Sequence, residues 1–134
     1  MRYIVTLLIP KFIDIELAIA IHNDLIETFG GSFGVRDIGL LESALAQPQA
    51  SFFGNFLHPT LEEQAAAYLY HIVKNHPFID GNKRTALGVM EAFLRMNETN
   101  LSISNNDLEN LVLDVAIGKL NKSDLALTLK KYFI

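Results

Sequence analysis

The residues most able to do chemistry lie within nine consecutive positions, residues 76–84. They bring together an imidazole, a carboxylate, a glycine, a carboxamide and two cations, in the order His76-Pro77-Phe78-Ile79-Asp80-Gly81-Asn82-Lys83-Arg84. No helix or turn needs this mixture for its own stability. Chemistry on phosphate groups does need this mixture. Such chemistry uses a base, a metal ligand, backbone N–H groups that a phosphate can approach closely, and positive charge.

A helix is expected to begin near Asn82, and its first turn would supply the phosphate-binding half of the site. The first N–H groups of a helix have no partner within it and carry the positive end of the helix dipole. Gly81 has no side chain that would keep a ligand away from these groups. Lys83 and Arg84 add positive charge at a helix end where cations are unfavourable unless an anion joins them. The segment therefore predicts an anion site.

Asp80 and His76 complete the predicted site. A carboxylate repels phosphate unless a divalent cation such as Mg²⁺ bridges the two, so Asp80 is interpreted as a metal ligand. His76 falls four residues after Ile72, which predicts that it continues the buried helical stripe and points inward, while Pro77 ends the helix there. His76 is interpreted as the general base for an incoming hydroxyl. The segment thus predicts phosphoryl or nucleotidyl transfer.

The elements that must position these groups are predicted to be helices. Helical spacing of apolar residues is found at residues 15–29, 37–45, 61–76, 82–97 and 107–117, and again from about residue 123. Gly30-Gly31 is expected to stop the first helix, Asp37 to cap the second and Thr60 to open the third with a capping box. Ser123 is expected to cap the last helix. The pattern predicts an all-α fold, a compact helical bundle of about six helices.

Outside the helices, two apolar stretches need a place in this fold. Residues 3–9 are apolar but too short to span a bilayer, and are interpreted as a short N-terminal arm. The aromatic residues Phe52, Phe53 and Phe56 flank a loop and are interpreted as core residues. We found no linker or internal repeat, so residues 1–134 are predicted to form a single domain.

Composition limits the function classes. Half of the residues are hydrophobic and only 19% are charged, which argues against disorder. There are no cysteines, so a disulfide scaffold, a thiolate metal site and a cysteine nucleophile are excluded. The net charge of −4 and the lack of a Lys/Arg run give little support to nucleic-acid binding. We expect a cytoplasmic protein that binds neither nucleic acid nor membrane directly.

Residues 76–84 resemble the signature of the Fic/Doc superfamily, specifically of its Doc (death-on-curing) branch. The resemblance extends to residues 34–45 and 63–67 and covers roughly residues 14–132. It implies a helical fold and a protein-modifying transferase that uses ATP and Mg²⁺. By the motif, His76 would be the catalytic base and Asp80 the magnesium ligand. The phosphate-binding residues would be Gly81, Asn82, Lys83 and Arg84.

Two positions favour phosphoryl transfer over AMP transfer within this resemblance. Fic enzymes that transfer AMP carry a glycine and a second arginine where this chain has Lys83 and Leu87. The Lys-Arg form resembles Doc toxins, which are Ser/Thr kinases that phosphorylate a threonine of elongation factor Tu and so arrest translation. The resemblance thus implies a kinase toxin of a toxin–antitoxin pair, with Fic-type AMP transfer as the alternative.

The resemblance also implies how the enzyme would be controlled. Many Fic proteins block their own site with a Ser/Thr-x-x-x-Glu helix, and here Ser104 and Glu109 are one residue too far apart for that spacing. Inhibition in trans by a small antitoxin therefore fits better. Arg36 and Asp37 fall where the family folds a flap that faces the substrate, although a turn followed by a helix cap explains them equally.

The site residues have structural interpretations as well. His76 alone is compatible with a core histidine, Asp80 or Asn82 with a helix cap, and Lys83 and Arg84 with solvated charges. A non-catalytic module that binds a peptide or a nucleotide in the same cleft is therefore a further alternative. Retention of the base together with the other polar residues argues for the enzyme, because a binding module has no need of a base.

One histidine outside the motif is interpreted as structural. His22 lies on the apolar face of the first predicted helix, and this placement favours a buried core residue over a catalytic one.

Overall fold

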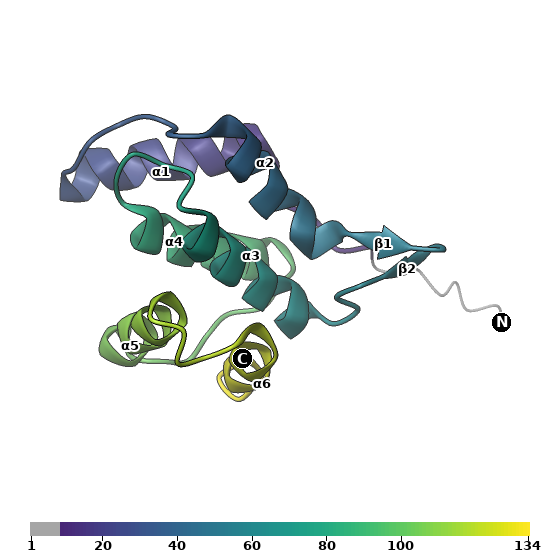
Figure 1. Ribbon diagram of the computed structural model, residues 1–134. Helices are drawn as coiled ribbons and strands as arrows, with labels where there is room; N and C mark the ends of the chain where they lie inside the picture. Colours follow the sequence, from purple (N-terminus) through teal and green to yellow (C-terminus); the bar gives the residue numbers. More distant parts are fainter. Residues whose placement is uncertain (1–8) are drawn as a thin grey trace, which may run out of the picture.

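The computed structural model describes residues 9–134, which form six α-helices and one small hairpin (Figure 1). The helices are α1 (Ile15–Phe29), α2 (Ile38–Ala46), α3 (Leu61–Asn75), α4 (Asn82–Met96), α5 (Asn105–Ala116) and α6 (Lys122–Lys130). A 3-10 turn, η1 (Gln47–Gln49), follows α2, and strands β1 (Ser51–Phe52) and β2 (Asn55–Phe56) pair antiparallel. The predicted all-α bundle of about six helices is confirmed. The N-terminal arm, apart from Ile9, lies outside the described residues.

Helix α3 is the centre of the bundle. It contacts α2, α4, α5 and α6, and α4 packs along it on one side (Figure 1). Consecutive alanines at residues 65–67 are completely buried, as is Tyr68, whose hydroxyl accepts a hydrogen bond from the Ile13 N–H at 2.8 Å. The small side chains allow close helix packing. The loop between α3 and α4 is therefore attached at both ends to tightly packed helices.

Local signals explain most helix starts. Asp37 accepts a hydrogen bond from the Leu40 N–H at 3.0 Å, and Thr60 accepts one from the Glu63 N–H at 3.3 Å, so both predicted caps are confirmed. The last helix differs from the prediction. Asn121, and not Ser123, caps α6, because its side chain accepts from the Asp124 N–H. Both residue types favour this role, and the earlier one fills it.

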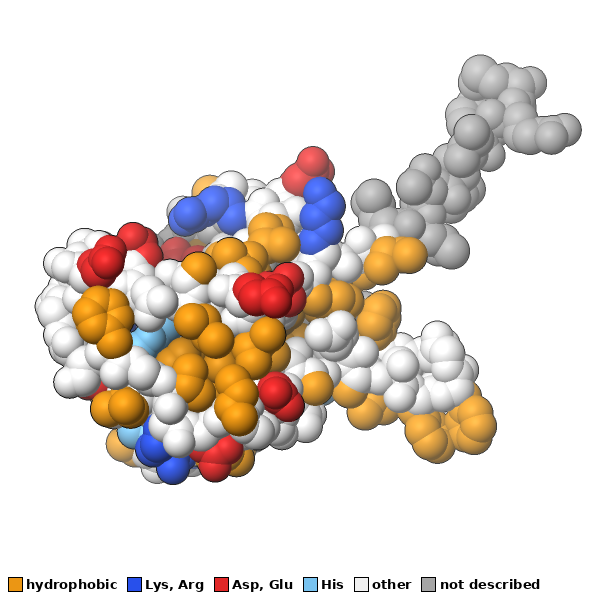
Figure 2. Space-filling model, turned by 90° about the horizontal axis from the view of Figure 1, so that it is seen from above, with side chains coloured by type: hydrophobic (Ala, Val, Ile, Leu, Met, Phe, Trp, Pro, Cys, Tyr) orange, Lys and Arg blue, Asp and Glu red, His pale blue; other side chains and the backbone are white. Residues whose placement is uncertain are grey.

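The β1–β2 hairpin projects from the body of the molecule (Figure 1 and Figure 2). The prediction that its aromatic residues belong to the core is wrong for two of the three. Phe52 is 64% exposed, and Phe53, at the turn, is 89% exposed. Phe56 is only half-buried and packs edge-on against Phe12, with ring centroids 5.7 Å apart. The hairpin leaves the bundle at this point, so Phe52 and Phe53 have no second layer to pack against.

None of the helices within residues 9–134 combines the length and the apolar character that a bilayer crossing requires.

Candidate active site at the α3–α4 loop

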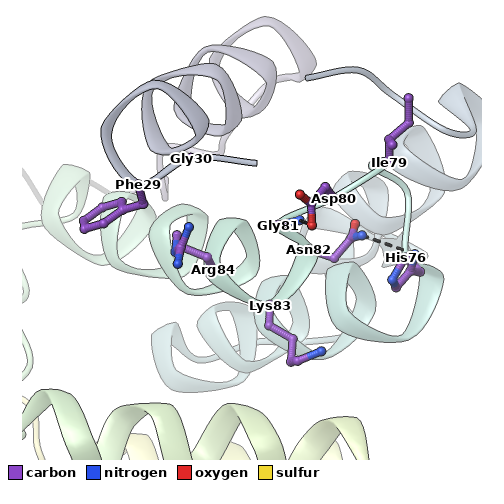
Figure 3. Close-up of a pocket in the computed structure, with 9 residues that line it drawn as sticks. All are labelled: Phe29, Gly30, His76, Ile79, Asp80, Gly81, Asn82, Lys83 and Arg84. Carbon is purple, nitrogen blue, oxygen red and sulfur yellow. Dashed lines mark hydrogen bonds between the residues drawn. The ribbon is translucent and has the colours of Figure 1, made fainter. Parts of the chain in front are cut away.

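The loop between α3 and α4 borders a pocket of about 460 Å³, together with the end of α1 and the start of α4 (Figure 3). The pocket is lined by Phe29, Gly30, His76, Ile79, Asp80, Gly81, Asn82, Lys83 and Arg84. All six residues of the motif with a predicted chemical role are therefore brought together. Arg36 and Asp37 are not among the lining residues.

His76 follows the last residue of α3 and has a left-handed backbone. Its φ and ψ are 50° and 55°, and its N–H donates to the carbonyl of Ile72 at 3.1 Å, which closes the helix. The prediction that the helix ends here is confirmed. The prediction that the imidazole points inward is wrong, because His76 is exposed. A left-handed residue leaves the helical path, so the spacing from Ile72 no longer determines where its side chain points.

Asn82 connects the imidazole to the backbone of the loop. Its oxygen accepts from the Phe78 N–H at 2.8 Å, and its amide nitrogen donates to the Phe78 carbonyl at 2.9 Å. The same nitrogen lies 3.2 Å from His76 Nδ1 (Figure 3). Because the amide orientation is set by Phe78, His76 Nδ1 must be the acceptor, and the proton of the neutral ring lies on Nε2. Asn82 is buried, so its two hydrogen bonds to Phe78 are shielded from water.

Asp80 presents an exposed carboxylate held by backbone groups. Its Oδ2 accepts from the Ser32 N–H at 3.0 Å, and its Oδ1 accepts from the Gly81 N–H at 2.9 Å. Each carboxylate oxygen has a second lone pair that these bonds do not use. Gly31 lies so close that a Cβ there would be 2.7 Å from Oδ2. Asp80 is not the helix cap, because the residue at that position is Gly81.

The start of α4 has no side-chain cap. Gly81, with φ of 73°, occupies the cap position, so the first N–H groups of the helix receive no hydrogen bond from a side chain there. Lys83 and Arg84 are exposed in this first turn and form no ion pair within residues 9–134. Arg84 lies over the Phe29 ring, 4.8 Å from its centroid. The result is a positive helix end that opens into the pocket.

Arg36 and Asp37 support the loop from outside the pocket. Arg36 donates from Nε to the His76 carbonyl at 2.8 Å and from Nη2 to the Asn75 carbonyl at 3.0 Å. Asp37 caps α2, as the turn-and-cap interpretation predicted. Residues 34–36 also pair with residues 77–79 through an antiparallel bridge and the Ile79 N–H bond to the Gly34 carbonyl at 3.0 Å. The segment closes one side of the loop.

Four residues of the site region have no chemical role in the sequence prediction. Phe29 contacts Arg84, while Gly31 and Ser32 surround the Asp80 carboxylate. His22 is buried, as predicted, but its Nε2 lies 2.8 Å from the Asp80 carbonyl oxygen. The apolar face around His22 was a correct signal for burial. Nothing local in the sequence indicates a contact with a residue 58 positions away.

Comparison with known proteins gives consistent results. The model of the Fic/DOC family matches residues 12–94, a range that contains every residue lining the pocket. A protein of Mycolicibacterium smegmatis named "Toxin Doc" is 46% identical over 74 residues. This match covers 55% of the chain and 57% of that relative, little more than half of either. "Protein kinase doc" of Escherichia phage P1 is 32% identical over 123 residues, covering 92% of the chain and 96% of that relative.

Proposed function

This chain belongs to the Fic/Doc family, and from that premise we propose that it is a Doc-type toxin that transfers the γ-phosphoryl group of ATP to a hydroxyl of a protein. The observation that carries the proposal is the uncapped start of α4, which opens into a pocket shared by an imidazole and a carboxylate. The name "Protein kinase doc" of the phage relative supports phosphoryl transfer over AMP transfer.

The start of α4 would bind the phosphates of ATP. Its free N–H groups follow Gly81, which has no side chain that could accept a hydrogen bond from them. Lys83 and Arg84 extend from the same turn and add two positive charges (Figure 3). Asn82 contributes indirectly, because both ends of its amide are engaged with the loop. The phosphate contacts are therefore assigned to backbone N–H groups and the two cations.

The residues present fit a magnesium ion delivered with the nucleotide. Asp80 offers one exposed carboxylate with unused lone pairs, and no cluster of three or more metal-binding side chains is found within residues 9–134. Mg²⁺ is commonly held by one or two carboxylates together with phosphate oxygens and water. Asp80 would be the protein ligand, and the bound ion would neutralise charge on the phosphates.

His76 would accept the proton of the target hydroxyl. A bond forms between the hydroxyl oxygen and the γ-phosphorus, the bond from that phosphorus to the β–γ bridging oxygen breaks, and ADP leaves. The unprotonated nitrogen of the resting ring is Nδ1, which contacts Asn82 at 3.2 Å. The contact with Asn82 therefore orients the ring before the target arrives, and proton uptake at Nδ1 requires that this long contact be released.

The partners follow from the same premise. The target hydroxyl is proposed to be a threonine of elongation factor Tu, so that transfer arrests translation. The name "Toxin Doc" of the mycobacterial relative supports a toxin, and a small antitoxin is proposed to inhibit it in trans. A cytoplasmic location stays a prediction.

One labelling experiment tests the reaction type. The protein is incubated with a cell extract and ATP labelled at either the γ or the α phosphate. Label transferred to protein from the γ position alone supports phosphoryl transfer. His76→Ala should reduce labelling by about 10²–10⁴-fold without unfolding, because the side chain is exposed. His71→Ala, on the same helix but outside the pocket, is the matched control and should retain labelling.

Two results would contradict the proposal. Label transferred from the α position would assign AMP transfer, the alternative reaction. The absence of label from either position, in a protein whose circular dichroism shows an intact helical fold, would favour a non-catalytic module that binds a peptide or nucleotide.

A further inference from the structure

We propose that His22 is a positioning residue for Asp80, acting through the peptide group that joins Asp80 to Gly81. The inference rests on the proposed function of Asp80 as the magnesium ligand. His22 itself does not line the pocket, so it has no direct contact with substrate or metal in this role.

The contact is made by a fully buried ring. His22 is 1% exposed, and its Nε2 lies 2.8 Å from the Asp80 carbonyl oxygen. A carbonyl oxygen can only accept a hydrogen bond, so Nε2 must carry a proton and donate it. If this donor were lost, the Asp80 carbonyl would have no hydrogen-bond partner at this position, which is unfavourable.

The ring is held in place by aromatic stacking. His22 and Phe78 lie almost parallel, with an interplanar angle of 6° and centroids 4.0 Å apart. Phe78 is itself completely buried, and both its N–H and its carbonyl are bonded to Asn82. The donor nitrogen of His22 is therefore fixed relative to the same loop whose carbonyl it binds.

Peptide geometry carries this restraint to the carboxylate. A trans peptide group is planar, with its carbonyl and its N–H pointing in opposite directions. Here the carbonyl is that of Asp80, bound to His22, and the N–H is that of Gly81, bound to Asp80 Oδ1 at 2.9 Å. Fixing the carbonyl fixes the N–H, and the N–H holds the carboxylate. Together with the Ser32 N–H that binds Oδ2, His22 therefore helps to set the direction in which Asp80 faces the pocket.

Three variants separate the hydrogen bond from the packing. His22→Gln and His22→Met have similar size and flexibility and both lose the ring stack, but only glutamine retains an N–H donor of suitable reach. His22→Phe keeps a ring against Phe78 and lacks the donor. Each variant is first examined by circular dichroism for native helix content. The Gln/Met pair is the principal comparison, and the Phe variant replaces Met if Met does not fold.

The first measurement needs no ligand. Hydrogen exchange of the Gly81 amide is followed by NMR in the free protein. The amide should exchange about tenfold faster in His22→Met and His22→Phe than in the native protein, while His22→Gln should remain within about threefold. Equal exchange rates in all four proteins would overturn the inference, whatever the function of the pocket.

The second measurement is the gain in ATP affinity that Mg²⁺ provides, obtained by calorimetry with Mg²⁺ or with EDTA. The outer partners of a metal ligand typically contribute 10–100-fold to metal affinity. His22→Met should therefore reduce the gain at least about tenfold, His22→Gln should restore most of it, and Kd in EDTA should stay within about twofold. A full gain in His22→Met would overturn the inference. If Mg²⁺ did not increase ATP affinity in the native protein, the proposed magnesium site would be contradicted instead. The hydrogen-exchange measurement would then still test the role of His22.

Discussion

At the scale of single residues, the side chain of Asn82 makes three polar contacts in the site. It binds both backbone groups of Phe78 and reaches His76 Nδ1 from a buried position. One side chain therefore fixes the shape of the loop and the orientation of the imidazole. Asn82 should therefore contribute both to activity and to stability.

Asn82→Ala tests this expectation. The change leaves the N–H and the carbonyl of Phe78 unpaired, so the free energy of unfolding should fall by about 2 kcal/mol. Transfer should fall at least about tenfold, because the general base is no longer oriented. Denaturant unfolding and the labelling assay measure the two effects.

Asn97 provides the matched control at the other end of α4. Its side chain also makes three hydrogen bonds, to Lys11 and Phe93, at the opposite end of the helix from Asn82. Asn97→Ala should also lower stability, though by less because its two bonds to Lys11 are exposed, and should leave the transfer rate of the folded protein unchanged. Equal losses of transfer in the two variants would show that Asn82 has no special relation to His76.

Arg36→Met distinguishes the two interpretations of Arg36. Its guanidinium binds the last carbonyls of α3, those of Asn75 and His76. If this support is its role, unfolding free energy should fall by about 1–2 kcal/mol and turnover should fall with it, while KM for the protein target stays unchanged. An increase in target KM without a change in Tm would assign Arg36 to a substrate-facing flap instead.

At the scale of elements, the segment that follows α1 has a second role besides ending the helix. Gly30-Gly31 was predicted only as a helix stop. In the structure Gly31 lies against Asp80 Oδ2, and the next N–H, that of Ser32, binds the same oxygen. The end of α1 thus forms one wall around the carboxylate.

Gly31→Ala and Gly30→Ala form a matched pair that tests this wall. Both glycines have positive φ, 119° and 89°, so both variants carry backbone strain of about 1–3 kcal/mol. Only at position 31 would the new Cβ meet Asp80, at 2.7 Å, because a Cβ at position 30 has no neighbour within 4 Å. Gly31→Ala should therefore weaken Mg²⁺-dependent ATP binding at least about tenfold, and Gly30→Ala should not. Similar binding in both variants would remove Gly31 from the site.

The sequence predicts the elements of this fold better than their junctions. The helices follow from apolar spacing and from caps such as Asp37 and Thr60, which are local signals. The direction of His76 could not be predicted, because it depends on a left-handed residue at the end of α3. The link between His22 and Asp80 joins positions 58 residues apart, so it depends on how α1 packs against the loop. The motif therefore predicts which chemical groups form the site, whereas the residues that contact those groups depend on tertiary packing.

At the scale of the whole molecule, a group of bases lies where α6 packs on α3. Lys122 Nζ is 3.1 Å from His71 Nε2. Burial lowers the pKa of His71 to about 4, with further lowering by Lys122 and His58. Burial and Lys122 also lower the pKa of His58, against smaller opposing effects of the Gln47 backbone and Glu63. Protonation of His71 would place a second positive charge against the lysine.

Stability should therefore decrease in mild acid. In the unfolded chain His71 takes up its proton near pH 6.5, whereas in the folded protein it does so only near pH 4. The unfolded state gains protons first, so the stabilisation is complete above pH 6.5 and is lost as the pH falls toward 4. With allowance for the half-exposed ring, we expect a loss of about 1 kcal/mol between pH 7 and pH 5, measured by denaturant unfolding.

His71→Gln isolates this contribution. Glutamine can accept the hydrogen bond from Lys122 but does not titrate, so the decrease between pH 7 and pH 5 should become smaller. The variant is needed because burial raises the pKa of Glu91, against a smaller opposing effect of Arg95, and a raised carboxyl pKa gives a pH dependence of opposite sign. An unchanged decrease in His71→Gln would exclude His71 as its source.

The bridge between residues 34–36 and the α3–α4 loop has a consequence for how the protein folds during synthesis. The contacts that shape the pocket join positions 40, 48 and 58 residues apart, from Arg36 to His76, from Ser32 to Asp80 and from His22 to Asp80. Contacts so distant in sequence form late, after the intervening chain has been made and folded. A ribosome that has completed only the first half of the chain therefore carries α1 and α2 without a pocket. The pocket comes into existence only when α4 has emerged and docked.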